Sequence, residues 1–296
     1  MSSPISMQQP QTGELVGSLA ERITLLTAAL PNWGLERALP LLRQVGISSV
    51  ELVAGPGTEL PDASAPTLRA AAAALDRAGV RVCGVAAPLA WRLGSTGSEA
   101  ALALAAELGA SFVRVYAHDY DRTQPAREQL DATVAHLEAL RTHADGTNVQ
   151  VLLETSAETV VPSPELARHV IDRAGPEGLG VVYDPGNMLV EGHLQPSYAV
   201  SLLGSLLGHV HAKNQQARWR DGRWCYEKTS FDRGQVNWSE VADALRPSYT
   251  GLISIDHLSG TATAARLKQD LETLRALVSA NHGEQRPPTS KLETPR

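Results

Sequence analysis

The sequence predicts a single-domain α/β protein with the architecture of a (β/α)8 TIM barrel. Its 296 residues, 43% of them hydrophobic and 20% charged, suffice for one large globular domain. Eight short apolar runs alternate with helix-forming stretches, which matches such a barrel in number and length. A doubly wound open sheet also alternates strands and helices, but no G-x-G-x-x-G follows an early strand and no P-loop motif occurs. The barrel is therefore the predicted fold.

The eight predicted strands are short and carry aliphatic or β-branched residues at most positions. In chain order they are ITLLT (23–27), SSVELV (48–53), VRVCGVAA (80–87), FVRVYA (112–117), VQVLLET (149–155), LGVVYD (179–184), LGHVHAK (207–213) and GLISID (251–256). Helices cover the outside of such a barrel, so the outward positions of each strand should be apolar.

The gaps between these runs contain predicted helices with recognisable ends. The clearest are PTLRAAAAALDRAG (66–79), GSEAALALAAELG (97–109), SPELARHVIDRAG (163–175) and TATAARLKQDLETLRALVSA (261–280). The first three end in Gly, which is a C-cap signal, and the third begins with Ser and Pro, which are typical of a helix N-terminus.

Both ends of the chain are polar, so we expect disordered tails at residues 1–18 and 282–296 around a barrel at 19–281. The N-terminus has neither the basic segment nor the apolar run of a secretory signal, and no apolar stretch is long enough for a transmembrane helix. A net charge of −6 argues against nucleic acid or an anionic membrane as a main partner. Two cysteines are too few for a disulfide framework. Together with the lack of a secretory signal and of a membrane span in the sequence, this predicts a cytoplasmic location.

Four consecutive predicted strands end in side chains that bind divalent metals, at the end of a barrel where active sites lie. These side chains are Glu154, Asp184, His211 and Asp256. Each alone is typical of a loop or helix cap, but they occupy equivalent places in four successive units. Three carboxylates and one imidazole predict a mixed oxygen and nitrogen site for Mn²⁺, Mg²⁺, Co²⁺ or Zn²⁺.

The segment GHVHAKN places His209, His211 and Lys213 on one face of the seventh strand, because residues two apart share a face. His211 is level with the other strand-end groups and is the predicted ligand. His209 lies one layer deeper, where we expect it to support the site without binding the metal. Lys213 lies one step above, nearer the substrate.

Several stretches resemble the xylose isomerase-like TIM-barrel superfamily, in particular its sugar phosphate isomerase/epimerase group. The matching stretches are VLLET, YDPGN, GHVHAKN, FDRGQVNW (231–238) and GLISID, within a correspondence that runs over roughly residues 20 to 280. The resemblance implies that Glu154, Asp184, His211 and Asp256 are metal ligands. Two positions depart from the family pattern: Asp256 stands where Glu is usual, and Asn187 stands where epimerases often have His. Shortening one carboxylate puts a symmetrical two-base epimerisation in doubt.

The predicted chemistry is proton abstraction next to a carbonyl, with a metal-stabilised enediolate. Glu154 and Asp256 would move the proton, and Lys213 would stabilise the oxyanion or move a proton itself. Loss of a group β to the carbonyl uses the same enolate, so a lyase or dehydratase is the alternative.

Further residues are expected around the substrate, and each also has a structural interpretation. The predicted substrate-binding residues are Glu51, His118, Asn187, Arg218 and Trp33. Glu51 equally suits a salt bridge at the barrel mouth, and His118 a solvated loop. The loop 215–228, with three arginines and two tryptophans, is expected to be either a substrate lid or a solvated or oligomer-contact loop.

The sequence therefore predicts a metal-dependent isomerase or epimerase acting on a small sugar-like molecule, with a homo-oligomer as a possible assembly. Abasic-site endonucleases of the same superfamily have sites richer in histidine, and the acidic charge of this chain argues against that activity. A barrel that serves as a non-catalytic subunit is the other class of interpretation.

Overall fold

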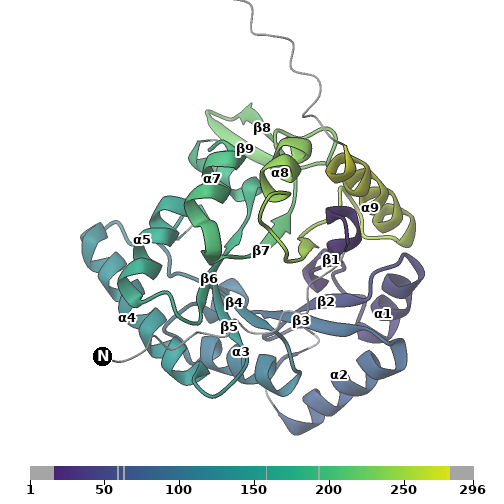
Figure 1. Cartoon of the computed structure of the whole chain (residues 1–296), viewed down its shortest axis with the longest axis horizontal. Helices are drawn as coiled ribbons and strands as arrows, with labels where there is room; N and C mark the ends of the chain where they lie inside the picture. Colours follow the sequence, from purple (N-terminus) through teal and green to yellow (C-terminus); the bar gives the residue numbers. More distant parts are fainter. Residues whose placement is uncertain (1–16, 59, 63, 158, 193, 281–296) are drawn as a thin grey trace, which may run out of the picture.

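Eight parallel strands form a nearly closed barrel surrounded by helices, in a computed structural model that describes residues 17–280 except 59, 63, 158 and 193 (Figure 1). The order of neighbouring strands around it is β1-β10-β7-β6-β5-β4-β3-β2. These strands are β1 (Ile23–Leu25), β2 (Ser49–Val53), β3 (Arg81–Ala86), β4 (Phe112–Tyr116), β5 (Gln150–Glu154), β6 (Leu179–Tyr183), β7 (Leu207–Ala212) and β10 (Ile253–Ile255). All eight predicted strands and the predicted TIM barrel are confirmed.

The seam between β1 and β2 closes the barrel with few contacts. The backbone bridge between Leu26 and Glu51 is isolated, and two threonine hydroxyls supplement it. Thr24 donates to the carbonyl of Ser49 at 2.6 Å, and the hydroxyl of Thr27 accepts from the amide of Val53 at 3.0 Å.

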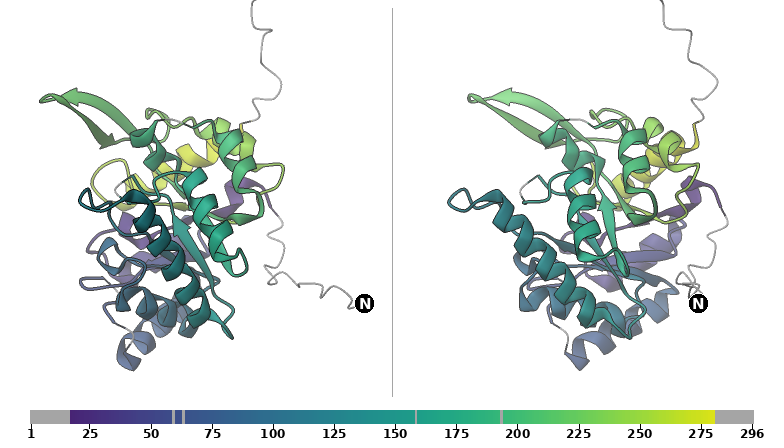
Figure 2. Two further views of the ribbon diagram at one scale, coloured as in Figure 1. Left: turned by 90° about the vertical axis from the view of Figure 1, so that its left-hand side faces the viewer. Right: turned by 60° about the vertical axis from the view of Figure 1, so that its left-hand side comes forward.

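Helices cover the outside of the strands (Figures 1 and 2). They are α1 (Leu35–Gln44), α2 (Ala65–Ala78), α3 (Thr96–Glu107), α4 (Ala126–Ala144), α5 (Pro164–Ala174), α6 (Pro185–Glu191), α7 (Pro196–Leu203), α8 (Trp238–Leu245) and α9 (Ala264–Ser279). Polar N-caps define several starts: the hydroxyl of Ser163 accepts from the amide of Leu166, as the sequence predicts for α5. No helix in the described part of the chain is long and apolar enough to cross a membrane.

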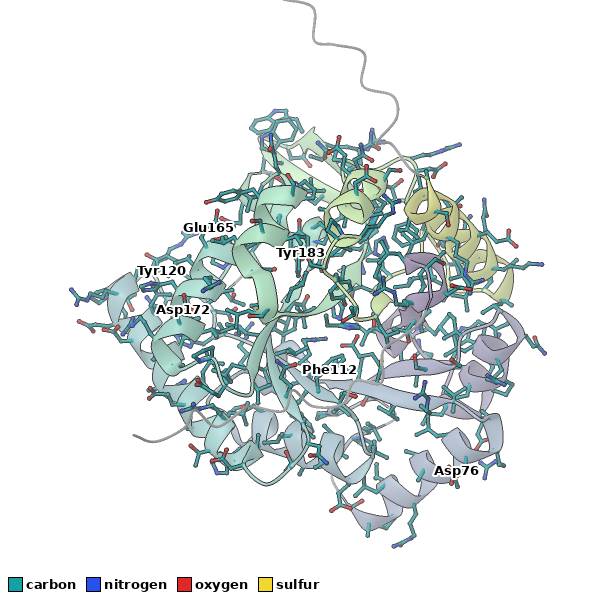
Figure 3. All side chains as sticks on the ribbon, viewed as in Figure 1. Asp76, Phe112, Tyr120, Glu165, Asp172 and Tyr183 are labelled. Atoms are coloured by element: carbon teal, nitrogen blue, oxygen red, sulfur yellow. The ribbon has the colours of Figure 1, made fainter. Side chains whose placement is uncertain are left out.

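The barrel interior has an apolar floor beneath a polar layer. Cys83, Phe112, Leu152 and Val182 pack together there, and Phe112 lies near the barrel centre in Figure 3, whereas Asp76 and Asp172 lie at the periphery. A Cβ atom at Gly84 would come 2.2 Å from the Phe112 ring, so glycine is required for this close approach. The polar side chains above this floor form the candidate site.

The segment 215–228, expected to be a loop, forms an antiparallel hairpin of β8 (Gln215–Arg220) and β9 (Arg223–Lys228). Figure 2 shows it projecting from the body of the barrel. Its tip, with Asp221 at a φ of 51° and Gly222 at 76°, is a two-residue turn that suits a hairpin. The predicted tails fall almost entirely outside the described residues.

Candidate metal centre and active site

The four predicted ligands lie at or just beyond the C-terminal ends of their strands. Glu154 is the last residue of β5, Asp184 directly follows β6, His211 lies in β7, and Asp256 directly follows β10. Glu154, Asp184 and His211 have no exposed surface, while the side chain of Asp256 is 18% exposed. The four groups therefore share the C-terminal end of the barrel interior.

Three of these residues form a compact ligand group. One ligand atom from each of Glu154, Asp184 and His211 lies within 4.8 Å of the other two. Nδ1 of His211 is buried and finds no hydrogen-bond partner among the described residues, and it lies 3.5 Å from Oε1 of Glu154. Two carboxylates and an imidazole with an open nitrogen fit a divalent metal.

The fourth predicted ligand, Asp256, joins this group through Lys213. The Nζ atom of Lys213 lies 2.7 Å from Oδ2 of Asp184 and 3.2 Å from Oδ2 of Asp256. Although burial opposes ionisation, Lys213 and His211 hold the pKa of Asp256 below its ordinary value. Burial raises the pKa of Asp184 to about 6, and Lys213 opposes that rise only in part. The ammonium group thus bridges two of the four predicted ligands.

The segment DPGN explains how Asp184 is held. Its Oδ1 atom accepts from the backbone amides of Gly186 at 2.9 Å and Asn187 at 3.0 Å, so it caps α6. Pro185 occupies the first helical position, where a missing amide proton costs nothing. A Cβ atom at Gly186 would lie 2.4 Å from Cγ of Lys213, so this glycine makes room for the lysine.

Asn187 contacts a predicted ligand in this structure. Its Nδ2 atom donates to the backbone carbonyl of Thr155 at 2.9 Å and to Oε1 of Glu154 at 3.3 Å. The amide thereby orients the Glu154 carboxylate. Contact between Asn187 and substrate stays a prediction.

Arg114 is a site residue that the sequence analysis missed. It is buried on β4, with Nε 3.1 Å from Oε2 of Glu154 and Nη1 donating to the carbonyl of Ala87 at 2.7 Å. Its guanidinium lies 4.3 Å from the ring centroid of Tyr116. Burial would raise the pKa of Glu154, but Arg114 and His211 hold it below its ordinary value. The signal was present in FVRVY, which places Phe112, Arg114 and Tyr116 on one face of a buried strand.

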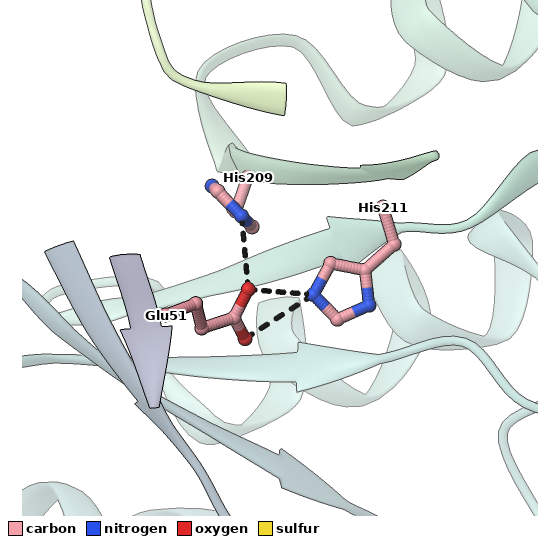
Figure 4. A group of neighbouring side chains, drawn as sticks. All are labelled: Glu51, His209 and His211. Atoms are coloured by element: carbon pink, nitrogen blue, oxygen red, sulfur yellow. Dashed lines mark hydrogen bonds and ion pairs between the residues drawn. The ribbon is translucent and has the colours of Figure 1, made fainter. Parts of the chain in front are cut away.

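Glu51 and His209 lie on the other side of the His211 ring (Figure 4). The Oε2 atom of Glu51 is 3.0 Å from Nε2 of His211 and 3.3 Å from Nε2 of His209. Nε2 of His209 is also 2.8 Å from the hydroxyl of Ser254. Glu51, predicted to bind substrate, is fully buried and contacts these two imidazoles in this structure. Glu51, His209 and His211 form a second group whose ligand atoms lie within 4.8 Å of one another, and His211 belongs to both groups.

Three predicted substrate residues make their contacts outside the ligand group. The ring of His118 lies 6.2 Å from that of His136, and burial lowers the pKa of His118. Trp33 stacks under the guanidinium of Arg37 at 3.8 Å. Arg218 pairs with Glu227 at 3.1 Å within the hairpin. Their contact with substrate stays a prediction.

The segment FDRGQVNW supports the backbone directly after β7, where Lys213 lies. The buried side chain of Asn214 donates to the carbonyls of Phe231 and Val236 and accepts from the amide of Val236. A Cβ atom at Gly234 would lie 1.9 Å from Oδ1 of Asn214, so glycine is needed there. The indole of Trp238 donates to the carbonyl of Lys213 at 3.2 Å. The loop and helix start thus fix the backbone on both sides of Asn214.

Comparison with known proteins assigns a family. The family described as "Xylose isomerase-like TIM barrel" matches residues 39–277. A search of curated proteins found no match.

Solved structures share the fold at low sequence identity, so they show the fold alone. The 3-keto-D-glucoside 4-epimerase YcjR from E. coli is 17% identical, with a TM-score of 0.69 over 86% of this chain and 99% of that one. The probable 3-DHS dehydratase AsbF from Bacillus anthracis is 16% identical, with a TM-score of 0.65 over 86% and 98%. The IOLI protein, solved with a bound zinc atom, is 16% identical, with a TM-score of 0.72 over 87% and 98%.

Proposed function

Because the chain belongs to the xylose isomerase-like TIM-barrel family, we propose that it is a divalent-metal-dependent enzyme that isomerises or epimerises a small sugar-like substrate. The observation that carries the proposal is the buried group of Glu154, Asp184 and His211, with the Nδ1 atom of His211 free to bind a cation. The structural neighbours include a sugar epimerase and a zinc-containing protein, which supports the same function.

The charge balance of the barrel interior also supports a divalent cation. Four carboxylates face two permanently cationic side chains there, and although burial opposes it, Glu51 and Glu154 raise the pKa of His211 well above its ordinary value, so in the metal-free protein a proton on His211 offsets part of the negative charge. The carboxylates belong to Glu51, Glu154, Asp184 and Asp256, and the cations to Arg114 and Lys213. Uncompensated buried charge is costly, so a dication bound by neutral imidazole would replace this proton and offset the negative charge.

Glu154, Asp184 and His211 would hold the metal, with Asp256 able to join once Lys213 moves aside. A bound metal supplies Lewis acidity toward the carbonyl and hydroxyl oxygens of a sugar. Glu154, oriented by Arg114 and Asn187, would take the proton from the carbon next to the carbonyl. The ammonium of Lys213 would stabilise the negative charge that develops on the substrate oxygen.

A dehydratase is the second candidate, and the pair of Lys213 and Asp256 favours it. At 3.2 Å from the shortened carboxylate, the ammonium can donate a proton to a leaving hydroxyl instead of returning one to carbon. A probable dehydratase among the structural neighbours is consistent with this alternative. In either reaction, the projecting hairpin with Arg218 would serve as a lid over the substrate.

The change Glu154→Gln tests the proposal, with Glu138→Gln on the exposed face of α4 as a matched control. We expect Glu154→Gln to lower bound divalent metal measured by plasma mass spectrometry and to abolish proton exchange between substrate carbon and deuterated solvent. The control should retain both. A metal-free wild type whose properties are indifferent to chelator would instead support a non-catalytic barrel, and full activity of Glu154→Gln would refute the assignment.

A further inference from the structure

A chain of buried polar groups crosses the barrel interior and ends on the His211 ring. It runs from the hydroxyl of Ser254 to Nε2 of His209, then to the carboxylate of Glu51, and from there to Nε2 of His211. Figure 4 shows the part from His209 to His211. Both oxygens of Glu51 lie near that last nitrogen, at 3.2 Å and 3.0 Å. The opposite ring nitrogen, Nδ1, faces Glu154.

A fully buried carboxylate needs hydrogen-bond donors, because losing hydration without replacing it is costly. The side chains that contact Glu51 in this chain of groups are two imidazoles, so the N–H groups of those rings must supply the bonds. A neutral imidazole carries one N–H and one lone pair. If the proton of His211 is on Nε2 toward Glu51, the lone pair is on Nδ1, which faces Glu154.

We propose that Glu51 is a positioning residue that fixes His211 in the tautomer whose Nδ1 lone pair is available to a divalent metal. The inference rests on the proposed function, since it concerns the same metal centre. Carboxylates that accept from a metal-binding histidine orient the ring and strengthen it as a ligand. Glu51 thus acts through His211 and does not bind the metal itself.

Zn²⁺ affinity measured by competition with a fluorescent chelator tests this role. In Glu51→Gln the side-chain NH2 can donate to Nε2, which favours the opposite tautomer, so we expect affinity to fall about 10- to 100-fold. Glu51→Asp keeps the charge and should recover part of the loss. Glu138→Gln should match the wild type. Thermal melts of each variant show whether the fold is retained.

Nuclear magnetic resonance of ¹⁵N-histidine-labelled wild type with Zn²⁺ tests the tautomer without a substitution at Glu51. We expect a Zn-bound Nδ1 and a protonated Nε2 for His211, and one Zn²⁺ per chain. A Zn-bound Nε2 would overturn the inference, as would a second Zn²⁺ held by Glu51, His209 and His211.

The two proposals fail differently. Wild-type affinity in folded Glu51→Gln would overturn only the positioning role, because the metal centre would remain. A wild type that binds no Zn²⁺ would overturn the metal centre and this inference together.

Discussion

The β8–β9 hairpin follows β7 closely in the chain, yet its ion pairs are exposed to solvent, whereas those of the barrel interior are buried. In the interior, Lys213 lies 2.7 Å from Asp184, with side chains 11% and 0% exposed. In the hairpin, Arg220 lies at the same 2.7 Å from Glu227, with side chains 59% and 40% exposed. The two pairs have equal N–O distances but very different exposure to solvent. The distance alone therefore does not measure how much an ion pair contributes to stability.

The difference follows from solvation. An exposed pair keeps most of its hydration and is screened by salt, so it contributes about 0–1 kcal/mol. A buried pair has given up hydration, and removing one partner leaves an uncompensated charge, which costs about 3–5 kcal/mol. Replacing a buried ion pair by apolar side chains is often neutral or stabilising, so the interior cluster is consistent with the function proposed for this site.

The largest expected effect is that of Lys213→Met. The change leaves Asp184 and Asp256 facing one another without the ammonium between them, so we expect the metal-free protein to lose about 3–5 kcal/mol of unfolding free energy. A divalent cation should restore part of this loss, because it supplies positive charge at the same carboxylates. Urea denaturation with and without Mn²⁺ measures both effects.

Lys268→Met is the matched control, since Lys268 is an exposed lysine in α9. It should change the unfolding free energy by less than about 0.5 kcal/mol, with or without Mn²⁺. A similar loss in both variants would show that the buried lysine is not energetically distinct from an exposed one.

Much of this site was predictable because strand parity and strand ends are local properties of the sequence. Glu154, Asp184 and His211 could be placed together from the common end of parallel strands. The bridging position of Lys213 could not, because it depends on how far a flexible side chain reaches across the barrel toward Asp256. Arg114 was missed because an arginine in a buried strand can be interpreted only once its partner on the next strand is known.

The hairpin was mistaken for a loop for a related reason. QQARWR and RWCYEK are rich in charged residues, and these two strands pair with each other instead of with strands of the barrel. Hydrophobic periodicity identifies strands that bury one face, so it failed where Trp219 and Trp224 remain exposed at 63% and 59%. Asp221 and Gly222 were the available signal, because an Asp-Gly pair is typical of the two-residue turn of a β-hairpin.

A smaller effect is expected from His257, a buried titratable group next to the site. Burial lowers the pKa of His257 to about 4, below the ordinary 6.5. Between these two values the unfolded chain binds more protons than the native protein, so stability is lost as the pH falls from about 6.5 to 4. Relative to His257→Gln, the wild type should lose roughly 2 kcal/mol between pH 7 and pH 4.5.

Urea denaturation of both proteins at several pH values measures this difference. Comparing wild type with variant cancels the other titrating groups to first order, because they are common to both. Parallel pH profiles would mean that His257 is as readily protonated in the native protein as in the unfolded chain.

The smallest expected effect is in the hairpin, where a double-mutant cycle of Arg220→Ala and Glu227→Ala isolates one exposed pair. The coupling free energy should be about 0.2–1 kcal/mol and should fall further in 1 M salt, because the screening length there is only about 3 Å. The second partner of Glu227, Arg218, is present in all four proteins, so it does not enter the difference. A coupling above about 2 kcal/mol that resists salt would mean that the pair is covered in solution. The hairpin would then resemble the interior, and a second copy or another molecule would have to lie against it.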